Sequence, residues 1–253
     1  FCNSPICRSA RCGGWFQQGC PSKPVEPTAV GGDHVRMTSN GGTPVDAASP
    51  LSSLTRKPER AADRALLDAL LDEAKVGTLG TVVDGLPWSV PMLFARDGDS
   101  IVLHGSTGAG ALRHVAAGAP VTFTVFVLDG LVVADTLFDH SANYRSAVVR
   151  GVPEVADDAQ AALEMLSDKL IPGRVAEVRS TTRKELAATV ALRLPIVDGQ
   201  WIAKARTGGP GGESAEWTGV VPVRTVYDAP VTHSGQTPPD SVRALVDPSR
   251  DVG

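Results

Sequence analysis

Cysteine is absent from almost the whole of this chain. All four cysteines, Cys2, Cys7, Cys12 and Cys20, fall within the first 20 of the 253 residues. Their spacing contains neither a CxxC pair nor a zinc-finger pattern, and four thiols gathered at one end cannot cross-link the rest of a fold. The sequence therefore argues against a disulfide framework, and we predict no metal site.

An excess of basic charge and long apolar runs are lacking as well. Lys and Arg number 24 against 28 Asp and Glu, which gives a net charge of −4. The cations are scattered, so the chain has no nucleic-acid footprint. The longest apolar runs, such as Val125 to Val133, contain Asp129 and Gly130 and are much shorter than the about 20 residues that cross a bilayer. Because no signal peptide is recognisable either, we expect a cytoplasmic protein that binds neither nucleic acid nor membranes.

Regular hydrophobic patterns are missing from both ends of the chain. Residues 1–54 are rich in Gly, Pro, Ser and Thr, so we expect a disordered or non-native N-terminal tail. The chain begins with Phe, and we expect Met37 to be the natural start, with residues 1–36 as upstream translated or added sequence. Residues 229–253 are polar and contain prolines, which predicts a flexible C-terminal tail. Residues 55–228 remain as one domain, long enough to bury a sizeable core.

Tight turns and alternating apolar residues predict a domain of short strands with helices between them. Asp84-Gly85 is a strong hairpin signal, and Asp129-Gly130 and Asp198-Gly199 predict two further hairpins. Helical spacing predicts helices that begin at Pro58, Ala111 and Asp157. The residues expected to face the core are Ala65, Leu66, Ala69 and Leu70 in the first helix and Ala161, Ala162, Met165, Leu166 and Leu170 in the third. This pattern is typical of an α+β fold built on a closed antiparallel barrel.

A glycine-rich loop follows the strand predicted at Ile101 to Leu103. It carries His104, Ser106, Thr107 and three glycines, and it leads into the helix that begins at Ala111. Small hydroxyls, close backbone approach and a helix N-terminus together can bind an anion, and a phosphate is the first candidate. The loop has neither Gly-Lys-Ser/Thr nor GxGxxG spacing, so a glycine-rich turn without a ligand stays open as the alternative.

Eight short segments follow one another in an order that matches a known family. They are Arg56-Lys-Pro-Glu-Arg60, Leu86-Pro87 to Pro91, Leu103-His-Gly-Ser106, Leu128-Asp-Gly-Leu131, His140-Ser-Ala-Asn-Tyr-Arg-Ser146, Pro172-Gly-Arg174, Lys204-Ala-Arg206-Thr-Gly-Gly-Pro210 and Trp217-Thr-Gly-Val-Val-Pro222. Together they resemble the nitroimidazole-resistance branch of the pyridoxamine 5′-phosphate oxidase-like flavoproteins, over residues 55–224. The resemblance implies a six-stranded split β-barrel of Greek-key type that forms a homodimer, with flavin mononucleotide (FMN) in the groove between the subunits.

The resemblance also implies where the cofactor lies on this sequence. The resemblance implies that the isoalloxazine ring runs along the backbone from Ser89 through Val90, Pro91 and Met92 to Leu93. It implies the flavin phosphate near Ser106, Thr107 and the residues up to Arg113, with His104 and Gly105 as further cofactor-binding residues. Relatives usually carry an Arg-Lys pair in the phosphate loop, whereas residues 108–110 are Gly-Ala-Gly here. Either Arg113, Lys204 or Arg206 supplies the missing charge, or neutral donors hold the phosphate alone and less tightly.

His104 is the candidate catalytic residue. In nitroimidazole-resistance relatives the histidine of this His-Gly motif lies beside the flavin, where it can deliver a proton to a reduced nitro group or hold an acidic substrate. Alternatively, His104 ends a strand with its ring bonded to a carbonyl. Arg145 and residues 140–144 form either a dimer-groove cluster, with Arg145 facing a cofactor or substrate anion, or a polar turn at a strand end. Trp217 either stacks on the flavin and covers the groove or belongs to the core.

These features predict an FMN-dependent oxidoreductase. The flavin is expected to take a hydride from a nicotinamide donor and to pass electrons to a small oxidised acceptor such as a nitro compound, while the protein binds and orients the cofactor. The alternative is a non-catalytic split-barrel protein that carries or senses haem, a deazaflavin or another ligand. In that case His104 or His140 is the candidate axial haem ligand.

Overall fold

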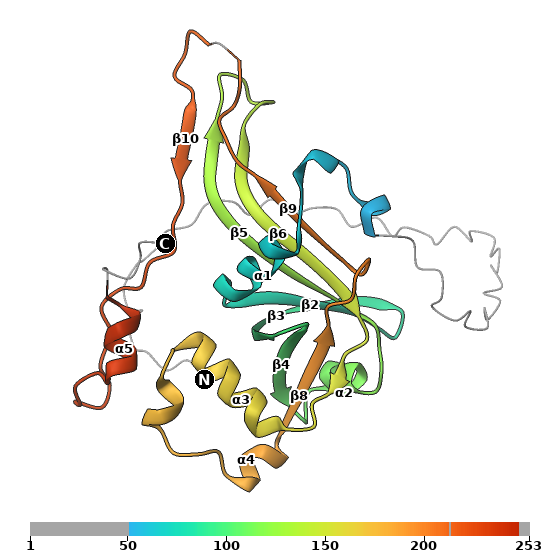
Figure 1. Cartoon of the computed structure of the whole chain (residues 1–253), viewed down its shortest axis with the longest axis vertical. Coiled ribbons are helices and arrows are strands. Elements are labelled where there is room, and N and C mark those ends of the chain that lie inside the picture. The colour runs from blue at the N-terminus through green and yellow to red at the C-terminus, as the bar shows by residue number, and fades with distance from the viewer. Residues whose placement is uncertain (1–50, 213, 248–253) are drawn as a thin grey trace, which may run out of the picture. The chain divides into compact units, whose positions relative to one another are not determined.

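The structure is a computed structural model that describes residues 51–212 and 214–247 (Figure 1). The four cysteines, Met37 and most of the predicted N-terminal tail lie outside these residues. The described strands are β1 (Ala61–Ala62), β2 (Val76–Val83), β3 (Leu86–Asp97), β4 (Ser100–Ser106), β5 (Val121–Val133), β6 (Ser141–Gly151), β7 (Glu154–Val155), β8 (Thr189–Pro195), β9 (Trp201–Arg206) and β10 (Gly219–Pro222). The described helices are α1 (Arg64–Glu73), α2 (Gly110–Ala116), α3 (Ala159–Leu170), α4 (Arg183–Ala187) and α5 (Asp240–Leu245), with 3-10 turns η1 (Leu51–Leu54), η2 (Pro58–Arg60) and η3 (Arg174–Glu177).

All strand pairings in the described chain are antiparallel and join into one sheet. The strand order is β1-β9-β6-β5-β2-β3-β4-β8-β7, with β10 paired to β5 beside this path. The predicted α+β split-barrel class is confirmed. The predicted strand number and closure are wrong, because the described sheet has ten strands and its pairing does not close into a ring. Short pairings at the edges, such as two-residue β1 and β7, carry too little pattern to be predicted from sequence.

One of the three predicted Asp-Gly hairpins is confirmed. Asp84 and Gly85 both have positive φ, 53° and 79°, which suits the tight turn between β2 and β3. Asp129-Gly130 instead lies inside β5, where the register against β6 shifts, so it is a β-bulge. A Cβ on Gly130 would lie only 3.0 Å from the Val220 side chain, so glycine there lets β10 approach β5. Asp198-Gly199 joins β8 to β9, which pair with other strands rather than with each other.

The helices are confirmed, but the start of the first one is wrong. Pro58 begins the short η2 turn, and α1 begins at Arg64 because the Asp63 carboxylate accepts a hydrogen bond from the Leu66 backbone N–H at 3.0 Å. The buried face of α1 consists of Leu67, Leu70 and Leu71, whereas Ala65 and Ala69 are exposed. In α3 the predicted core residues Ala162 and Leu166 are buried.

The sheet has an inner and an outer face, defined by the alternation of side chains along each strand. The inner face packs around Phe94 and Phe123, whose rings meet edge to face with centroids 5.0 Å apart, and α1 closes this core with its leucines. On the outer face, α3 lies over β3, β4 and β8 (Figure 1). We call this the covered half; it buries Ala95, Val102 and Ala191 against α3.

Part of the remaining outer face has no helix over it in the described chain. We call this part the uncovered half; it comprises β2, the first half of β3, and β5. Its exposed apolar side chains are Val76, Val82, Leu93 and Phe126. Exposed apolar residues gathered on one sheet face are typical of an interaction surface.

The C-terminal segment contains a helix that is fixed to the domain. Ser241 in α5 is buried, and its backbone N–H and hydroxyl both donate to the Glu177 carboxylate, at 3.0 Å and 2.5 Å. The tail predicted over 229–253 therefore includes an anchored element. No helix within the described ranges is long and apolar enough to cross a membrane.

Candidate functional site

The candidate site lies where β3 and β4 diverge. The two strands pair from Asp97 opposite Ser100 to Phe94 opposite Leu103, and the pairing then stops. The first half of β3 continues on β2 alone, and the end of β4, from His104 onward, continues on β8 alone. The divergence leaves one edge of each strand without a β-partner in the described sheet.

The edge of β3 at this divergence presents free backbone groups. Pro87 and Pro91 lie within the segment paired to β2, and prolines fit such a segment only where the missing N–H would point away from the neighbour. Ser89 and Leu93 share this alternation with the two prolines, so their N–H groups also point away from β2. Two donors and several carbonyl oxygens therefore line the side from which β4 has departed.

The predicted ring-contact residues divide between the two faces. Ser89 and Pro91 are exposed on the outer face, whereas Val90 and Met92 are half-buried and pack against the inner core. Val90 and Met92 therefore offer no side chain to a ligand on the outer face, and by the same alternation their backbone groups point toward β2.

His104 stands on the outer face at the same divergence. It pairs with Ala191 of β8, and its side chain shares the face of Val102. Its Nδ1 is buried and has no hydrogen-bond partner in the described chain, so the predicted alternative of a ring bonded to a carbonyl through this atom is not observed. Burial lowers the pKa of His104 below its ordinary value, which keeps the imidazole neutral at pH 7. A neutral ring with an unsatisfied nitrogen is suited to accept a proton or a metal ion.

The loop after His104 uses most of its donors internally. Ser106 Oγ accepts from the Gly108 N–H at 3.2 Å, and the Thr107 N–H and hydroxyl both donate to the Ala188 carbonyl, at 3.0 Å and 3.3 Å. A Cβ on Gly105 would lie 2.1 Å from Leu112 Cδ1, so this glycine permits α2 to pack on β4. What remains for an anion is the first turn of a seven-residue helix and Arg113, which is exposed and without a partner in the described chain.

The other predicted cations are already engaged elsewhere. Arg145 binds the carboxylates of Asp129, at 2.7 Å, and Glu73, which together raise its pKa. Lys204 donates to Thr55 Oγ1 and the Arg56 carbonyl, and Arg206 donates to Asn143 Oδ1 at 2.7 Å. Lys204 and Arg206 lie on β9, five strand positions from β4, or about 24 Å along the sheet at the usual strand spacing. Within the described subunit these two cations therefore bind protein groups rather than the loop after His104.

Two further candidates lie away from the divergence. Trp217 is 68% exposed just before β10, so it is not a core residue. His140 is exposed in the loop between β5 and β6, where its Nδ1 contacts the Thr136 carbonyl at 2.6 Å. This contact leaves the other ring nitrogen of His140 available, a feature that sequence reasoning did not specify.

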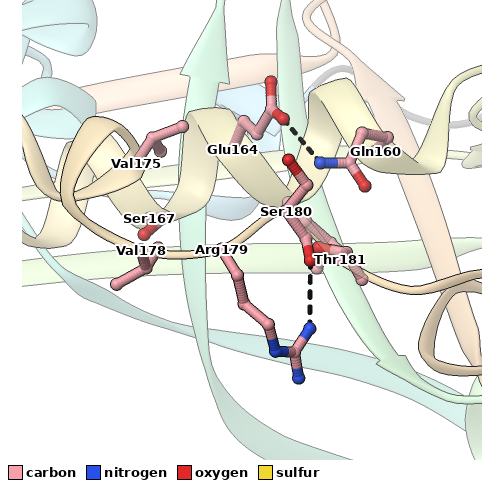
Figure 2. Close-up of a pocket in the computed structure, with 9 residues that line it drawn as sticks. Gln160, Glu164, Ser167, Val175, Val178, Arg179, Ser180 and Thr181 are labelled. Atoms are coloured by element: carbon pink, nitrogen blue, oxygen red, sulfur yellow. Dashed lines mark hydrogen bonds between the residues drawn. The ribbon is translucent and has the colours of Figure 1, made fainter.

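A pocket beside α3 is too small for a flavin or a haem (Figure 2). It has a volume of about 90 Å³, whereas ligand pockets usually measure about 300–1,000 Å³. Figure 2 shows Gln160 bonded to Glu164, and Arg179 bonded to the Ser180 carbonyl at its rim. The described residues also contain no group of three or more His, Cys, Asp or Glu side chains placed to hold a metal ion.

The fold and the open edge beside His104 define a split-barrel protein, and comparisons give its family. A family model described as pyridoxamine 5′-phosphate oxidase matches residues 63–201, so the chain belongs to the pyridoxamine 5′-phosphate oxidase-like family. The family predicted from the sequence is thereby confirmed. No curated protein matches the chain.

Several solved structures resemble this chain. The FAD and haem binding protein from Mycobacterium smegmatis is 45% identical, with a TM-score of 0.71 over 74% of this chain and 97% of that protein. The flavocytochrome Anf3 from Azotobacter vinelandii is 28% identical, with a TM-score of 0.69 over 78% of this chain and 97% of that protein. A protein described as a 5-nitroimidazole antibiotic resistance protein from Bacteroides thetaiotaomicron is 21% identical, with a TM-score of 0.48 over 57% of this chain and 85% of that protein.

Proposed function

We propose that this protein is an oxidoreductase that binds a flavin and a haem on the outer face where β3 and β4 diverge. The observation that carries this proposal is the 45% identity to an FAD and haem binding protein over nearly its full length. The likeness to a flavocytochrome over a similar share of the chain supports it. The flavin predicted from the sequence was FMN; the name of the 45% identical relative favours FAD.

The free edge of β3 fits the polar edge of a flavin ring. Such a ring carries N–H and C=O groups in a row, and the outward backbone groups of Ser89, Pro91 and Leu93 offer complementary acceptors and donors. The exposed Leu93 side chain adds an apolar contact. The loop after His104 satisfies its own donors, so we propose that Arg113 supplies the charge for a flavin phosphate.

His104 fits the requirements of a haem ligand. An iron ligand must be a neutral imidazole, and burial keeps His104 in this form near pH 7. His104 stands on the same face as the free edge of β3, so a group bound to it lies close to a flavin at that edge. His140 is the alternative ligand, because its Nδ1 is fixed by Thr136 and its other nitrogen is available.

The two groups define what the protein's own residues have to do. When bound, a flavin supplies hydride and single-electron transfer, and a haem supplies a one-electron centre. The β3 edge would orient the flavin ring, and the neutral imidazole of His104 would hold the haem iron. A nicotinamide donor and a small oxidised acceptor are the substrates that we propose for this arrangement.

We also propose that the protein works as a homodimer. The uncovered half exposes Val76, Val82, Leu93 and Phe126, an apolar surface that a second copy can bury. A two-fold contact there would cover the β3 edge and exclude water from the flavin. It also gives Lys204 and Arg206 of one subunit a route to a cofactor that is held by the other subunit.

Reconstitution of the full chain tests this proposal. The protein is incubated separately with FAD, FMN and haemin, desalted, and examined for retained flavin bands and the haem Soret band. We expect about one FAD and one haem per subunit, with FAD retained better than FMN. A desalted protein that keeps neither group would overturn the proposal.

A pair of histidine variants sharpens the test. His104→Ala should lose haem while keeping its flavin, and His140→Ala should retain both groups. If only His140→Ala loses haem, the haem ligand is His140, in the loop between β5 and β6, and not His104. Turnover with nicotinamide donors and nitro compounds or quinones as acceptors then separates an oxidoreductase from a non-catalytic carrier.

A further inference from the structure

The segment over residues 223–239 is held at both ends but not along its length. At its start the Val223 N–H donates to the Asp129 carbonyl at 3.0 Å. At its far end Ser241 in α5 is held by Glu177. Figure 1 shows the segment running from β10 to α5. We call residues 223–239 the strap.

The strap has little to bind in its own chain. Within the described residues, none of the backbone groups from 224 to 238 takes part in a backbone–backbone hydrogen bond. Its large apolar side chains face solvent, with Val226 64%, Tyr227 44% and Val231 80% exposed. A segment that is anchored at both ends, exposes three apolar side chains and joins no strand of its own sheet is suited to lie against another surface.

The strap is also separate from the part of the chain that defines the family. The family model ends at residue 201, whereas the strap begins at 223. The barrel therefore does not need the strap to form its core, and the core clusters contain none of its residues. Substitutions in the strap can therefore test subunit assembly without disturbing the folding of the barrel.

We infer that the strap of one subunit packs against the uncovered half of a second copy of this chain. The chain itself carries the matching surface, because in the uncovered half Val76, Val82, Leu93 and Phe126 remain 42–56% exposed. The strap cannot leave its own side freely, because Asp129 and Glu177 hold its two ends. In a two-fold dimer the contact forms twice, once from each strap, which doubles the apolar area that holds the copies together. This inference rests on the homodimer in the proposed function.

The dimer dissociation constant of the full chain tests the role of the strap. The triple variant Val226→Ser, Tyr227→Ser, Val231→Ser removes the exposed apolar groups of the strap. The matched control is Val152→Ser with Val197→Ser, which removes exposed apolar groups from two other loops. Sedimentation equilibrium should show at least tenfold weaker dimerisation for the strap variant, about 1.4 kcal/mol, and no change for the control.

Three results would overturn the inference. They are a monomeric wild-type protein, an unchanged dissociation constant in the strap variant, and equal weakening in the control. If the triple variant fails to fold, Val231→Ser alone serves instead, because a side chain that is 80% exposed cannot hold the subunit core together. A smaller weakening is expected for Ser241→Ala, which loosens only the anchor.

The visible spectrum of the same samples separates this inference from the proposed function. A strap variant that dissociates but retains flavin and haem supports both. A wild-type dimer that weakens as expected on strap substitution but binds neither group supports the strap and contradicts the proposed function. If the wild-type protein retains both groups and strap substitution leaves the dimer dissociation constant unchanged, only the inference about the strap is contradicted.

Discussion

The covered and uncovered halves of the outer sheet face have similar apolar side chains but different neighbours. In the covered half, Ala95 and Val102 are almost fully buried because α3 lies on them. In the uncovered half, Leu93 follows the same alternation as Ala95 only two residues away, yet it is 42% exposed. The boundary runs through the point where β3 and β4 diverge, beside His104.

This difference indicates what each half is for. Side chains beneath α3 stabilise the subunit by burial, so their loss should appear in unfolding experiments. Side chains in the uncovered half are only partly buried by their own chain, so their loss should appear mainly in binding or assembly. The site that we propose lies at the border, where the rigid covered half supports His104 and the open half leaves room for ligands.

The largest expected effect is in the covered half. Leu166→Ala removes a side chain of α3 that is 2% exposed and leaves a cavity above Val102 and Ala191. We expect the free energy of unfolding to fall by about 2–5 kcal/mol, measured by urea denaturation. A loss below about 0.5 kcal/mol would mean that α3 does not seal this half.

Matched substitutions in the uncovered half should act on assembly instead. Phe126→Ser removes a side chain that is 56% exposed in the isolated subunit. We expect its unfolding free energy to fall by only about 1 kcal/mol when measured on the dissociated subunit, because the half-exposed ring loses its contact with Tyr144 but little other burial. Sedimentation equilibrium on the same variant should show weaker dimerisation. A large loss of subunit stability with unchanged dimerisation would reverse the comparison.

Arg145 links α1 of the inner core to β5 of the uncovered half through ion pairs, and its loss should give a smaller effect. It joins Glu73 at the end of α1 to Asp129 in the bulge of β5, with its side chain 26% exposed. Arg145→Met should lower the unfolding free energy by about 1 kcal/mol, because bidentate arginine–carboxylate pairs are stronger than ordinary surface ion pairs. Flavin retention should not change. Selective loss of flavin would restore the interpretation of Arg145 as a cofactor ligand.

Lys169 ties the end of α3 to the inner core. Its amine lies 3.4 Å from the centroid of the Phe94 ring and donates to the Leu71 carbonyl at 2.6 Å. Burial lowers the pKa of Lys169 to about 7, with repulsion from nearby Lys75 adding to the shift. Asp72 opposes this shift, and Arg96 adds to it. The folded state therefore holds this proton less tightly than the unfolded state does.

A pH dependence of stability follows from this shift. Between pH 7 and the ordinary lysine pKa near 10.5, the unfolded state binds more protons at this position, so stability should rise with pH over this range. Lys169→Met should reduce this rise, as measured by urea unfolding at pH 7 and pH 9. An identical pH dependence in both proteins would mean that Lys169 titrates normally in the folded state.

Local signals allowed much of the fold to be predicted, and tertiary contacts decided the rest. Asp84-Gly85 forms the predicted hairpin, because a two-residue turn is fixed by its own dihedral preferences. Asp129-Gly130 is the same dipeptide but forms a bulge, because β10 packs on Gly130. Since β10 lies about 90 residues further along the chain, no local pattern reveals that contact. The start of α1 was missed because Pro58 is a good first residue for any helix, whereas the Asp63 cap decides where α1 begins.

The candidate site was predictable where it depends on strand ends. His104 and Ser106 follow the apolar run of β4, and Ser89 and Pro91 lie on β3, so family motifs in order were enough to bring them together. The engagement of Arg145 by Glu73 and Asp129 was not predictable, because charges far apart in sequence carry no signal of their pairing. The unpartnered Nδ1 of His104 likewise depends on what packs around it.

The central claim is that flavin and haem bind at the divergence of β3 and β4 on the border of the uncovered half. Amide hydrogen exchange of the full chain, with and without reconstituted FAD and haem, tests it most directly. The account predicts slower exchange in residues 86–93 and 104–107 when the groups are bound, and unchanged exchange around the small pocket at residues 160–181. Protection at residues 160–181 without protection of the β3 edge would contradict it.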